Sequence, residues 1–237
     1  MLKIENYTKI YSNGKKAVNN LNIHVLPGDL FAFIGHNGAG KTTTIKSVAG
    51  ILEFNEGRIL IDGVSIKDDP LLCKNKIAYI PDNPDLYDSL TGMQYLNFIA
   101  DIFKLSKDER KERIEYYAGM FELTDYLNNL ISSYSHGMKQ KLALICAFIH
   151  EPKLLILDEP FVGLDPKAAY TVKQLMKDLC AKGGAIFFST HILEVAEKLC
   201  NKIAIIKNGE LVVTGSMEEI TKDTSLENVF LELTERA

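Results

Sequence analysis

Residues 35–42 read Gly35-His36-Asn37-Gly38-Ala39-Gly40-Lys41-Thr42 and fit the pattern G-x-x-x-x-G-K-[ST] in full. An apolar stretch, residues 30–34, precedes them, and a segment of helical character begins at Lys41. Glycines at these positions let consecutive backbone N–H groups converge on phosphate oxygens, and the helix N-terminus adds partial positive charge. Pattern and context together predict a loop that binds the phosphates of a nucleotide.

Side chains of the same segment add charge and hydroxyl groups. The Lys41 ammonium is placed to balance the β- and γ-phosphates, and the Thr42 hydroxyl is placed to ligate Mg²⁺. Thr43 supplies one more donor, while His36 occupies a variable position of the pattern and receives no role. The nucleotide-binding residues predicted from this stretch are Asn37, Gly38, Ala39, Gly40, Lys41, Thr42 and Thr43.

Composition restricts the class of protein. The 237 residues are 46% hydrophobic and 24% charged, which suffices for a core without disulfides or a structural metal. With 27 basic and 31 acidic side chains the formal net charge is −4, so no general attraction to nucleic acid is expected. The longest apolar run, residues 142–149, is much shorter than the ~20 residues of a membrane-spanning helix. Cysteines without CxxC spacing and an N-terminus without a signal-peptide core favour a cytoplasmic location.

Apolar strand-like runs alternate with helical segments along most of the chain. Strands are predicted at residues 30–34, 76–80, 154–157 and 185–189, and Asn208-Gly209 predicts a hairpin near the C-terminus. Between about residues 84 and 150 the pattern is helical, with Thr91 and Ser106 as N-caps. This order predicts an α/β fold with a parallel sheet, interrupted by a helical insertion.

Two acidic residues, Asp158 and Glu159, follow directly after the apolar run 154–157. Because successive side chains of a strand point to opposite faces, we expect the two carboxylates to have different targets. Asp158 is predicted to hold the Mg²⁺ shell, as the second acid of such phosphate-binding sites does. Glu159 is predicted to be the general base, or to orient the attacking water.

Other segments distinguish this chain from the many nucleotide-hydrolysing proteins with a phosphate-binding loop. In chain order they are Tyr134-Ser135-His136-Gly137-Met138-Lys139-Gln140-Lys141, Gly163-Leu164-Asp165-Pro166 and Ser189-Thr190-His191. Together with the phosphate loop and the acidic pair, they resemble the motifs of ATP-binding cassette (ABC) proteins. The resemblance runs from Tyr11 to about Gly215. Within that family the sequence is most similar to ATP-binding subunits of bacterial exporters, including those of the Ecs type.

The resemblance implies a P-loop NTPase (RecA-like) core with a mostly parallel sheet, an N-terminal antiparallel β subdomain and an inserted helical subdomain. We expect a single ABC ATPase domain over residues 1–237. Its nucleotide-binding core would comprise residues 1–83 and 151–224. Residues 84–150 would form the helical insertion with the signature motif, and residues 225–237 a C-terminal tail.

The resemblance also implies roles for individual residues. Tyr11 matches the aromatic side chain that stacks on adenine. Ser135 and Gly137 match the signature motif, which contacts the γ-phosphate of ATP bound by a second subunit. Asp165 matches the loop through which two subunits communicate. His191 matches the histidine that contacts the γ-phosphate and steadies the general base.

Two segments depart from the family pattern. The usual signature motif is LSGGQ, whereas this chain has Tyr-Ser-His-Gly-Met, with His136 for a glycine and Met138 for the glutamine. The larger departure is Asp82, where the family has a glutamine that reaches the Mg²⁺ shell and senses the membrane subunit. We expect Asp82 to reach Mg²⁺ through a water molecule and to keep a coupling role.

The expected reaction is the hydrolysis of ATP to ADP and phosphate, with ATP and Mg²⁺ as the cofactors of the site. Lys41, Glu159 and His191 are the predicted catalytic residues, acting through positioning and charge stabilisation. Two ATP molecules would be buried between two cassettes. The pair would be a homodimer or this chain with a paralogous cassette.

Transport would require a separate membrane permease, because no segment of this sequence is a candidate to cross a bilayer. We expect the permease to dock on the helical insertion, with the protein peripheral on the inner face of the cell membrane, and the family likeness favours export. Candidate docking residues are Leu86, Tyr87, Leu90, Tyr95 and Phe98. The alternative function is a soluble ABC ATPase that acts on a ribosome, DNA or a protein assembly.

Overall fold

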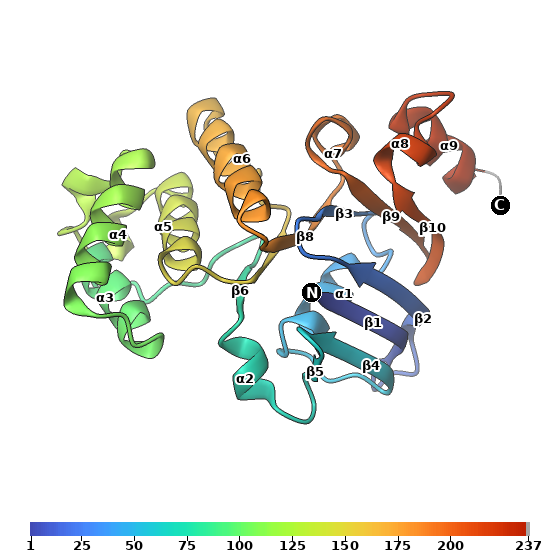
Figure 1. Ribbon diagram of the computed structural model, residues 1–237, viewed down its shortest axis with the longest axis horizontal. Coiled ribbons are helices and arrows are strands. Elements are labelled where there is room, and N and C mark those ends of the chain that lie inside the picture. The colour runs from blue at the N-terminus through green and yellow to red at the C-terminus, as the bar shows by residue number, and fades with distance from the viewer. Residues whose placement is uncertain (236–237) are drawn as a thin grey trace.

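The larger of two β-sheets forms the centre of the molecule (Figure 1), for which a computed structural model describes residues 1–235. Its strand order is β10-β9-β3-β8-β7-β6. The parallel strands are β3 (Leu30–Ile34), β6 (Ile77–Ile80), β7 (Leu154–Asp158), β8 (Ala185–Thr190) and β9 (Lys202–Lys207). At one edge β10 (Glu210–Ser216) pairs antiparallel with β9, which confirms the predicted hairpin.

A smaller antiparallel sheet is built from strands near the N-terminus, in the order β2-β1-β4-β5. Its strands are β1 (Leu2–Ile10), β2 (Lys16–Val25), β4 (Glu56–Ile61) and β5 (Val64–Ser65). The two sheets confirm the fold class expected from the sequence, a mostly parallel core sheet with an N-terminal antiparallel β portion.

Helices surround the sheets, and most of them begin at a capping residue that the sequence indicates. Thr91 and Ser106 form capping boxes with Gln94 and Glu109, as predicted. The helices are α1 (Lys41–Val48), α2 (Pro70–Lys74), α3 (Gly92–Ile102), α4 (Lys107–Met120), α5 (His136–Ile149), α6 (Pro166–Ala181), α7 (Leu193–Leu199), α8 (Met217–Ile220) and α9 (Leu226–Glu235). Short 3₁₀ turns lie at Thr124–Tyr126 and Ile131–Ser133. Within residues 1–235, none of the helices combines the length and apolar character needed to span a membrane.

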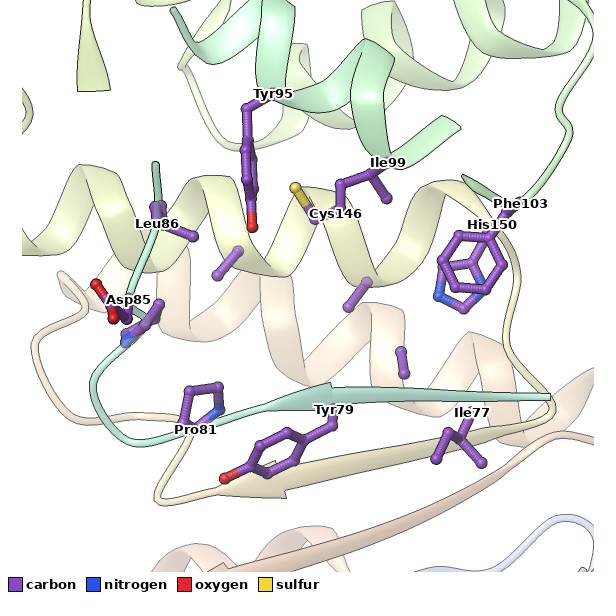
Figure 2. A pocket seen from close by; sticks show the side chains of 14 residues that line it. Ile77, Tyr79, Pro81, Asp85, Leu86, Tyr95, Ile99, Phe103, Cys146 and His150 are labelled. Carbon is purple, nitrogen blue, oxygen red and sulfur yellow. The ribbon is translucent and has the colours of Figure 1, made fainter. Parts of the chain in front are cut away.

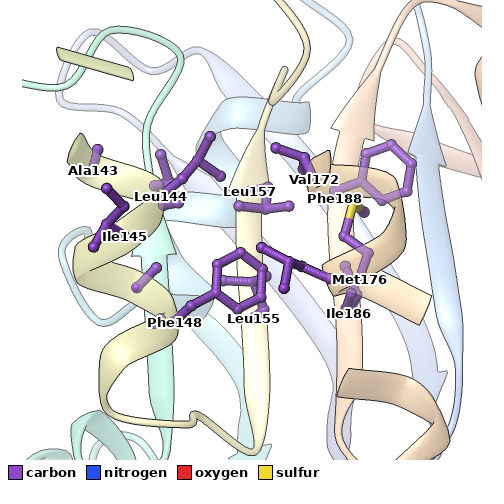
Figure 3. Close-up of a cluster of buried hydrophobic side chains, with 14 of the residues drawn as sticks. Ala143, Leu144, Ile145, Phe148, Leu155, Leu157, Val172, Met176, Ile186 and Phe188 are labelled. Carbon is purple, nitrogen blue, oxygen red and sulfur yellow. The ribbon is translucent and has the colours of Figure 1, made fainter. Parts of the chain in front are cut away.

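Both faces of the central sheet are covered, so β3, β7 and β8 are buried along their whole length. On one face, side chains of α5 and α6 pack on the sheet, and Figure 3 shows Phe148 beside Leu155, and Met176 beside Ile186 and Phe188. The other face packs against α1 and the smaller sheet. The hydrophobic effect therefore holds the central strands from both sides.

The parallel arrangement decides where polar residues gather. The residues after β3, β7 and β8 lie at the same edge of the sheet because β8 pairs in parallel with both neighbours. Open parallel sheets bind ligands at this carboxyl edge. Here that edge carries the phosphate loop, the acidic pair and His191.

Replacing Leu157 by alanine should destabilise the fold by about 2–5 kcal/mol, because this fully buried side chain lies between α5 and α6. Urea or thermal unfolding followed by circular dichroism measures the loss. Leu71→Ala is the matched control, since Leu71 is 74% exposed, and it should leave the free energy of unfolding nearly unchanged. Equal stability of both variants would contradict the assignment of Leu157 to the core.

Candidate active site

The phosphate loop connects β3 to the first turn of α1, where the backbone N–H groups of a helix start are free to bind an anion. Gly40 has a φ of 109°, and a Cβ there would lie 2.8 Å from the carbonyl oxygen of Ala17. Only glycine fits this combination of positive φ and close approach. Asn37, Gly38 and Thr42 are exposed at the surface, which leaves the loop accessible to a phosphate chain.

Lys41 is 6% exposed, and its ammonium rests within the loop. The Nζ atom donates hydrogen bonds to the carbonyl oxygens of Gly35 at 2.6 Å and His36 at 3.3 Å. Burial lowers the pKa of Lys41, while the charges of Glu159 and Asp158 act in the opposite direction. The ammonium thus feels the charge of the acidic pair while its hydrogen bonds go to backbone carbonyls.

Asp158 ends β7 and is 2% exposed. Its Oδ1 atom accepts a hydrogen bond from the Ser189 hydroxyl on the neighbouring strand β8. Its Oδ2 atom is buried and has no hydrogen-bond partner among residues 1–235. A buried carboxylate oxygen without a donor fits contact with a cation or with water bound to it.

The acidic surroundings fit Mg²⁺ better than a metal that needs a full protein cage. In the described part of the chain, no group of three or more His, Cys, Asp or Glu side chains could hold a metal. Mg²⁺ instead keeps several waters and takes one or two carboxylates together with phosphate oxygens. The Asp158 carboxylate and the Thr42 hydroxyl at the start of α1 are oxygen groups of the kind that such a set uses.

Asp82 lies just beyond β6 and is exposed, and its Oδ1 atom accepts the backbone N–H of Asn83 at 2.9 Å. Tyr79 is a residue of β6, and its hydroxyl is buried and has no partner within residues 1–235. Burial raises the pKa of Tyr79, and the charges of Asp158 and Asp82 add to the rise. The charges of both carboxylates therefore oppose ionisation of the same hydroxyl.

Glu159 and His191 form a pair at the same edge of the sheet. The His191 Nδ1 atom lies 2.9 Å from Glu159 Oε2, and the His191 backbone N–H also donates to this oxygen at 3.4 Å. The Glu159 side chain is 16% exposed, whereas that of His191 is 57% exposed. The carboxylate is oriented by the histidine while both remain open to a substrate.

The two carboxylates have different partners, as expected, but the predicted cause, the alternation of side chains along a strand, was wrong. Glu159 lies beyond the last residue of β7 and has a φ of 51°, so the pleat does not set its direction. Its backbone N–H donates to the carbonyl oxygen and hydroxyl of Ser189. The carboxylates do have different partners, Ser189 for Asp158 and His191 for Glu159.

Ser189 is a residue of this site to which sequence reasoning assigned no role. It contacts both acids and is fully buried. A signal was present, because Ser189 immediately precedes Thr190-His191 at the end of an apolar run. Its role depends on the pairing of β7 with β8, which one sequence does not specify.

Tyr11 lies beside the phosphate loop, after β1. Its hydroxyl is 3.1 Å from Thr43 Oγ1, and the side chain is 39% exposed. The Lys9 ammonium lies 5.3 Å from the ring centroid. The ring is therefore fixed at one end near the start of α1, with area left for a stacking partner.

The signature segment begins α5, on the helical side of the molecule and away from α1 (Figure 1). Ser135 is the N-cap, its hydroxyl accepting the Met138 backbone N–H at 3.3 Å, and Gly137 lies in the first turn. Ser135 is exposed. The structure thus brings the phosphate loop, the acidic pair and His191 together in one chain, and leaves Ser135 and Gly137 apart from them.

The unusual His136 contacts the loop before α6. A Cβ on Gly163, which has a φ of 78°, would lie 2.6 Å from the His136 ring, so the imidazole occupies the space that glycine leaves. On the same helix Lys141 pairs with Asp165 at 2.7 Å, and this ammonium holds the pKa of the Asp165 carboxyl below its usual range. Signature segment and loop are therefore fixed to each other within one chain.

Comparisons with known proteins agree with this geometry. The sequence profile of the family described as "ABC transporter" matches residues 18–162. The ABC-type transporter ATP-binding protein EcsA of Bacillus subtilis (strain 168) is 35% identical over 99% of this chain and 96% of its own length.

Solved structures give the same result. A structure described as the ATP-binding subunit of an ABC transporter is 36% identical and superposes with a TM-score of 0.94, covering 98% of this chain and 99% of that one. The ATP-binding cassette MJ0796, solved as a dimer bound to ADP and Pi, is 26% identical with a TM-score of 0.83, over 92% of this chain and 99% of the other. The chain belongs to the ABC transporter family and is one of its ATP-binding subunits.

Proposed function

We propose that this chain binds ATP with Mg²⁺ on residues 35–43 and hydrolyses it between two cassettes, driving export by a separate membrane permease. The observation that carries the proposal is the group at the carboxyl edge of the sheet. It joins the buried Lys41, the unpartnered oxygen of Asp158 and the Glu159–His191 pair. Charge balance, metal contact and a base are the parts that phosphoryl transfer to water needs.

In this mechanism water attacks the γ-phosphorus in line, and the bond to the oxygen that bridges the β- and γ-phosphates breaks. Glu159 accepts the proton of the water, held by His191. Lys41 leaves the carbonyls of Gly35 and His36 and contacts the β- and γ-phosphates, where it balances the negative charge that develops as ADP departs. Mg²⁺, when bound through Asp158 and Thr42, supplies further neutralisation of that charge.

Dimerisation follows from the separation of the two half-sites. Ser135 and Gly137 are accessible but lie apart from the phosphate loop of their own chain, so they complete the site of a second copy or a paralogous cassette. MJ0796 forms a dimer with nucleotide bound, which supports this assembly. Tyr11 stacks on the adenine of the nucleotide in its own chain.

A groove lies between β6, α3 and α5, and Figure 2 shows Leu86, Tyr95 and Cys146 pointing into it; we propose that the permease docks there. Its volume is about 250 Å³. Tyr87 and Phe98 are 58% and 42% exposed beside it, with ring centroids 5.7 and 6.4 Å from that of Tyr95. An aromatic rim around an apolar groove suits a short amphipathic helix from the permease.

The groove and the active site share strand β6. Tyr79 and Pro81 line the groove, and Asp82 follows them directly. Movement of a docked helix would therefore reach Asp82 and, through it, the water shell of the metal. We propose that residues 84–150 couple the permease to a nucleotide-binding core of residues 1–83 and 151–224.

Transport is favoured over action on a ribosome, DNA or another assembly by the near full-length match to a transporter ATP-binding protein. The groove gives the chain a place for a membrane partner, which would hold it on the inner face of the cell membrane. Of the predicted tail, 225–237, the last two residues lie outside the described residues.

Glu159→Gln should lower ATP hydrolysis about 10²–10⁴-fold, because the amide cannot accept the proton, while ATP binding persists. Phosphate release and light scattering with ATP should show slow turnover and an accumulated dimer. Glu194→Gln, a change at an exposed acid of α7, is the control and should behave as the wild type. A monomeric Glu159→Gln variant at saturating ATP would contradict the assembly.

Asp82→Ala should raise the Mg²⁺ concentration for half-maximal hydrolysis roughly tenfold, as loss of a group that orients metal-bound water does. Titration of ATPase activity with Mg²⁺ measures the shift, and reconstitution with the permease measures coupled turnover. Asp125→Ala changes another exposed aspartate, on the helical side, and should have no effect. An unchanged Mg²⁺ titration together with unchanged coupling would remove Asp82 from this role.

Tyr87→Ala should weaken co-purification with a multi-spanning membrane protein at least severalfold, because an exposed aromatic anchor is lost from the groove rim. Tyr116→Ala is the matched control, since Tyr116 is 57% exposed on α4, outside this groove. Basal ATPase activity should survive in both variants. Full retention of the membrane partner by Tyr87→Ala would place the docking site elsewhere.

A further inference from the structure

The C-terminal helix α9 contacts the phosphate loop through one aromatic pair. The ring centroids of Phe230 in α9 and His36 in the loop are 4.8 Å apart, at an angle of 58°. Phe230 is 8% exposed, whereas His36 is exposed. The pair joins a residue near the end of the chain to a variable position of the loop, which has no role of its own in the nucleotide-binding pattern.

Helix α9 is fixed to other parts of the active-site edge. Its first residue, Leu226, is fully buried and donates its backbone N–H to Glu197 of α7 at 3.3 Å. Near its other end the Thr234 carbonyl accepts a hydrogen bond from Lys207, the last residue of β9, at 2.8 Å. In Figure 1, α9 lies at the same end of the molecule as α8 and β10. Phe230 therefore contacts His36 from a helix that hydrogen bonds hold near both of its ends.

The backbone of His36 is part of the turn that shapes the loop. Its carbonyl oxygen accepts the Ala39 N–H at 3.1 Å and the Lys41 ammonium at 3.3 Å. The preceding Gly35 is also confined, since a Cβ there would lie 2.5 Å from the carbonyl oxygen of Ile206. The position of His36 therefore affects Ala39 and Lys41, two residues of the predicted phosphate-binding loop.

We propose that Phe230 is a positioning residue, through which α9 supports the phosphate loop at His36 and raises its affinity for nucleotide. The inference rests on the proposed binding of ATP to residues 35–43. A loop whose backbone is already fixed loses less conformational freedom when the ligand arrives. Aromatic pairs contribute an amount equivalent to about a two- to tenfold change in affinity.

Coupling between α9 and the nucleotide must act in both directions. If docked α9 strengthens nucleotide binding by some factor, bound nucleotide strengthens the docking of α9 by the same factor. A helix that merely completes the core would not show this reciprocity. Amide hydrogen exchange in residues 226–235 measures the docking equilibrium directly.

The test compares Phe230→Ala with Leu231→Ala, a matched change at a 42% exposed residue of the same helix. Phe230→Ala should bind a fluorescent ATP analogue about two- to tenfold more weakly, with KM raised and kcat kept. Adding the non-hydrolysable analogue should slow exchange in α9 of the wild type and of Leu231→Ala. In Phe230→Ala this protection should be lost.

Further variants keep the outcome decisive. His36→Ala should reproduce the affinity loss. Combining it with Phe230→Ala should weaken binding little further, because each change removes the same contact. If Phe230→Ala does not fold, Phe230→Leu and His36→Ala carry the test. Wild-type affinity and wild-type protection of α9 in His36→Ala would overturn the inference. Lys41→Ala separates the two proposals. If Lys41→Ala binds the analogue normally, the proposed binding of ATP to this loop is wrong. If Lys41→Ala loses binding while Phe230→Ala and His36→Ala bind as the wild type does, only the role of α9 is wrong.

Discussion

The hydrogen bond between Ser189 and Asp158 is the interaction on which the rest of the site depends. It joins β7 and β8 at the residues where both strands end, and the same serine receives the backbone N–H of Glu159. One buried hydroxyl thereby sets the direction of the Asp158 carboxylate and the start of the turn that carries Glu159. Because polar groups in a dry interior are costly when unpaired, this arrangement leaves little freedom to either acid.

Much of the fold could be predicted from the sequence, since apolar runs and capping residues report local structure. Strand β3 is apolar throughout, and β7 and β8 are apolar up to their last one or two residues, which is typical of strands covered on both faces. The loop at residues 35–42 could also be placed, because strand, glycines and helix follow one another. The sequence does not show which strands pair side by side, so the contacts of Ser189 with the two acids were not predicted.

The remaining gaps concern residues whose meaning depends on distant partners. The φ of 51° at Glu159 follows from its hydrogen bonds to β8, and no local pattern indicates it. His36 and Phe230 are far apart in the sequence, and the packing of α9 beside the loop brings their rings together. In each case tertiary contact overrides what the neighbouring residues suggest.

The contact between His136 and Gly163 has a consequence for how this sequence can diverge. The imidazole fills the volume above the glycine, so a side chain at 163 and a ring at 136 exclude one another. The positive φ at 163 adds a second restriction, because a β-branched residue could not adopt it without strain. Substitutions at these two positions are therefore coupled. A larger side chain at position 163 requires that the ring at position 136 is first replaced by a smaller side chain.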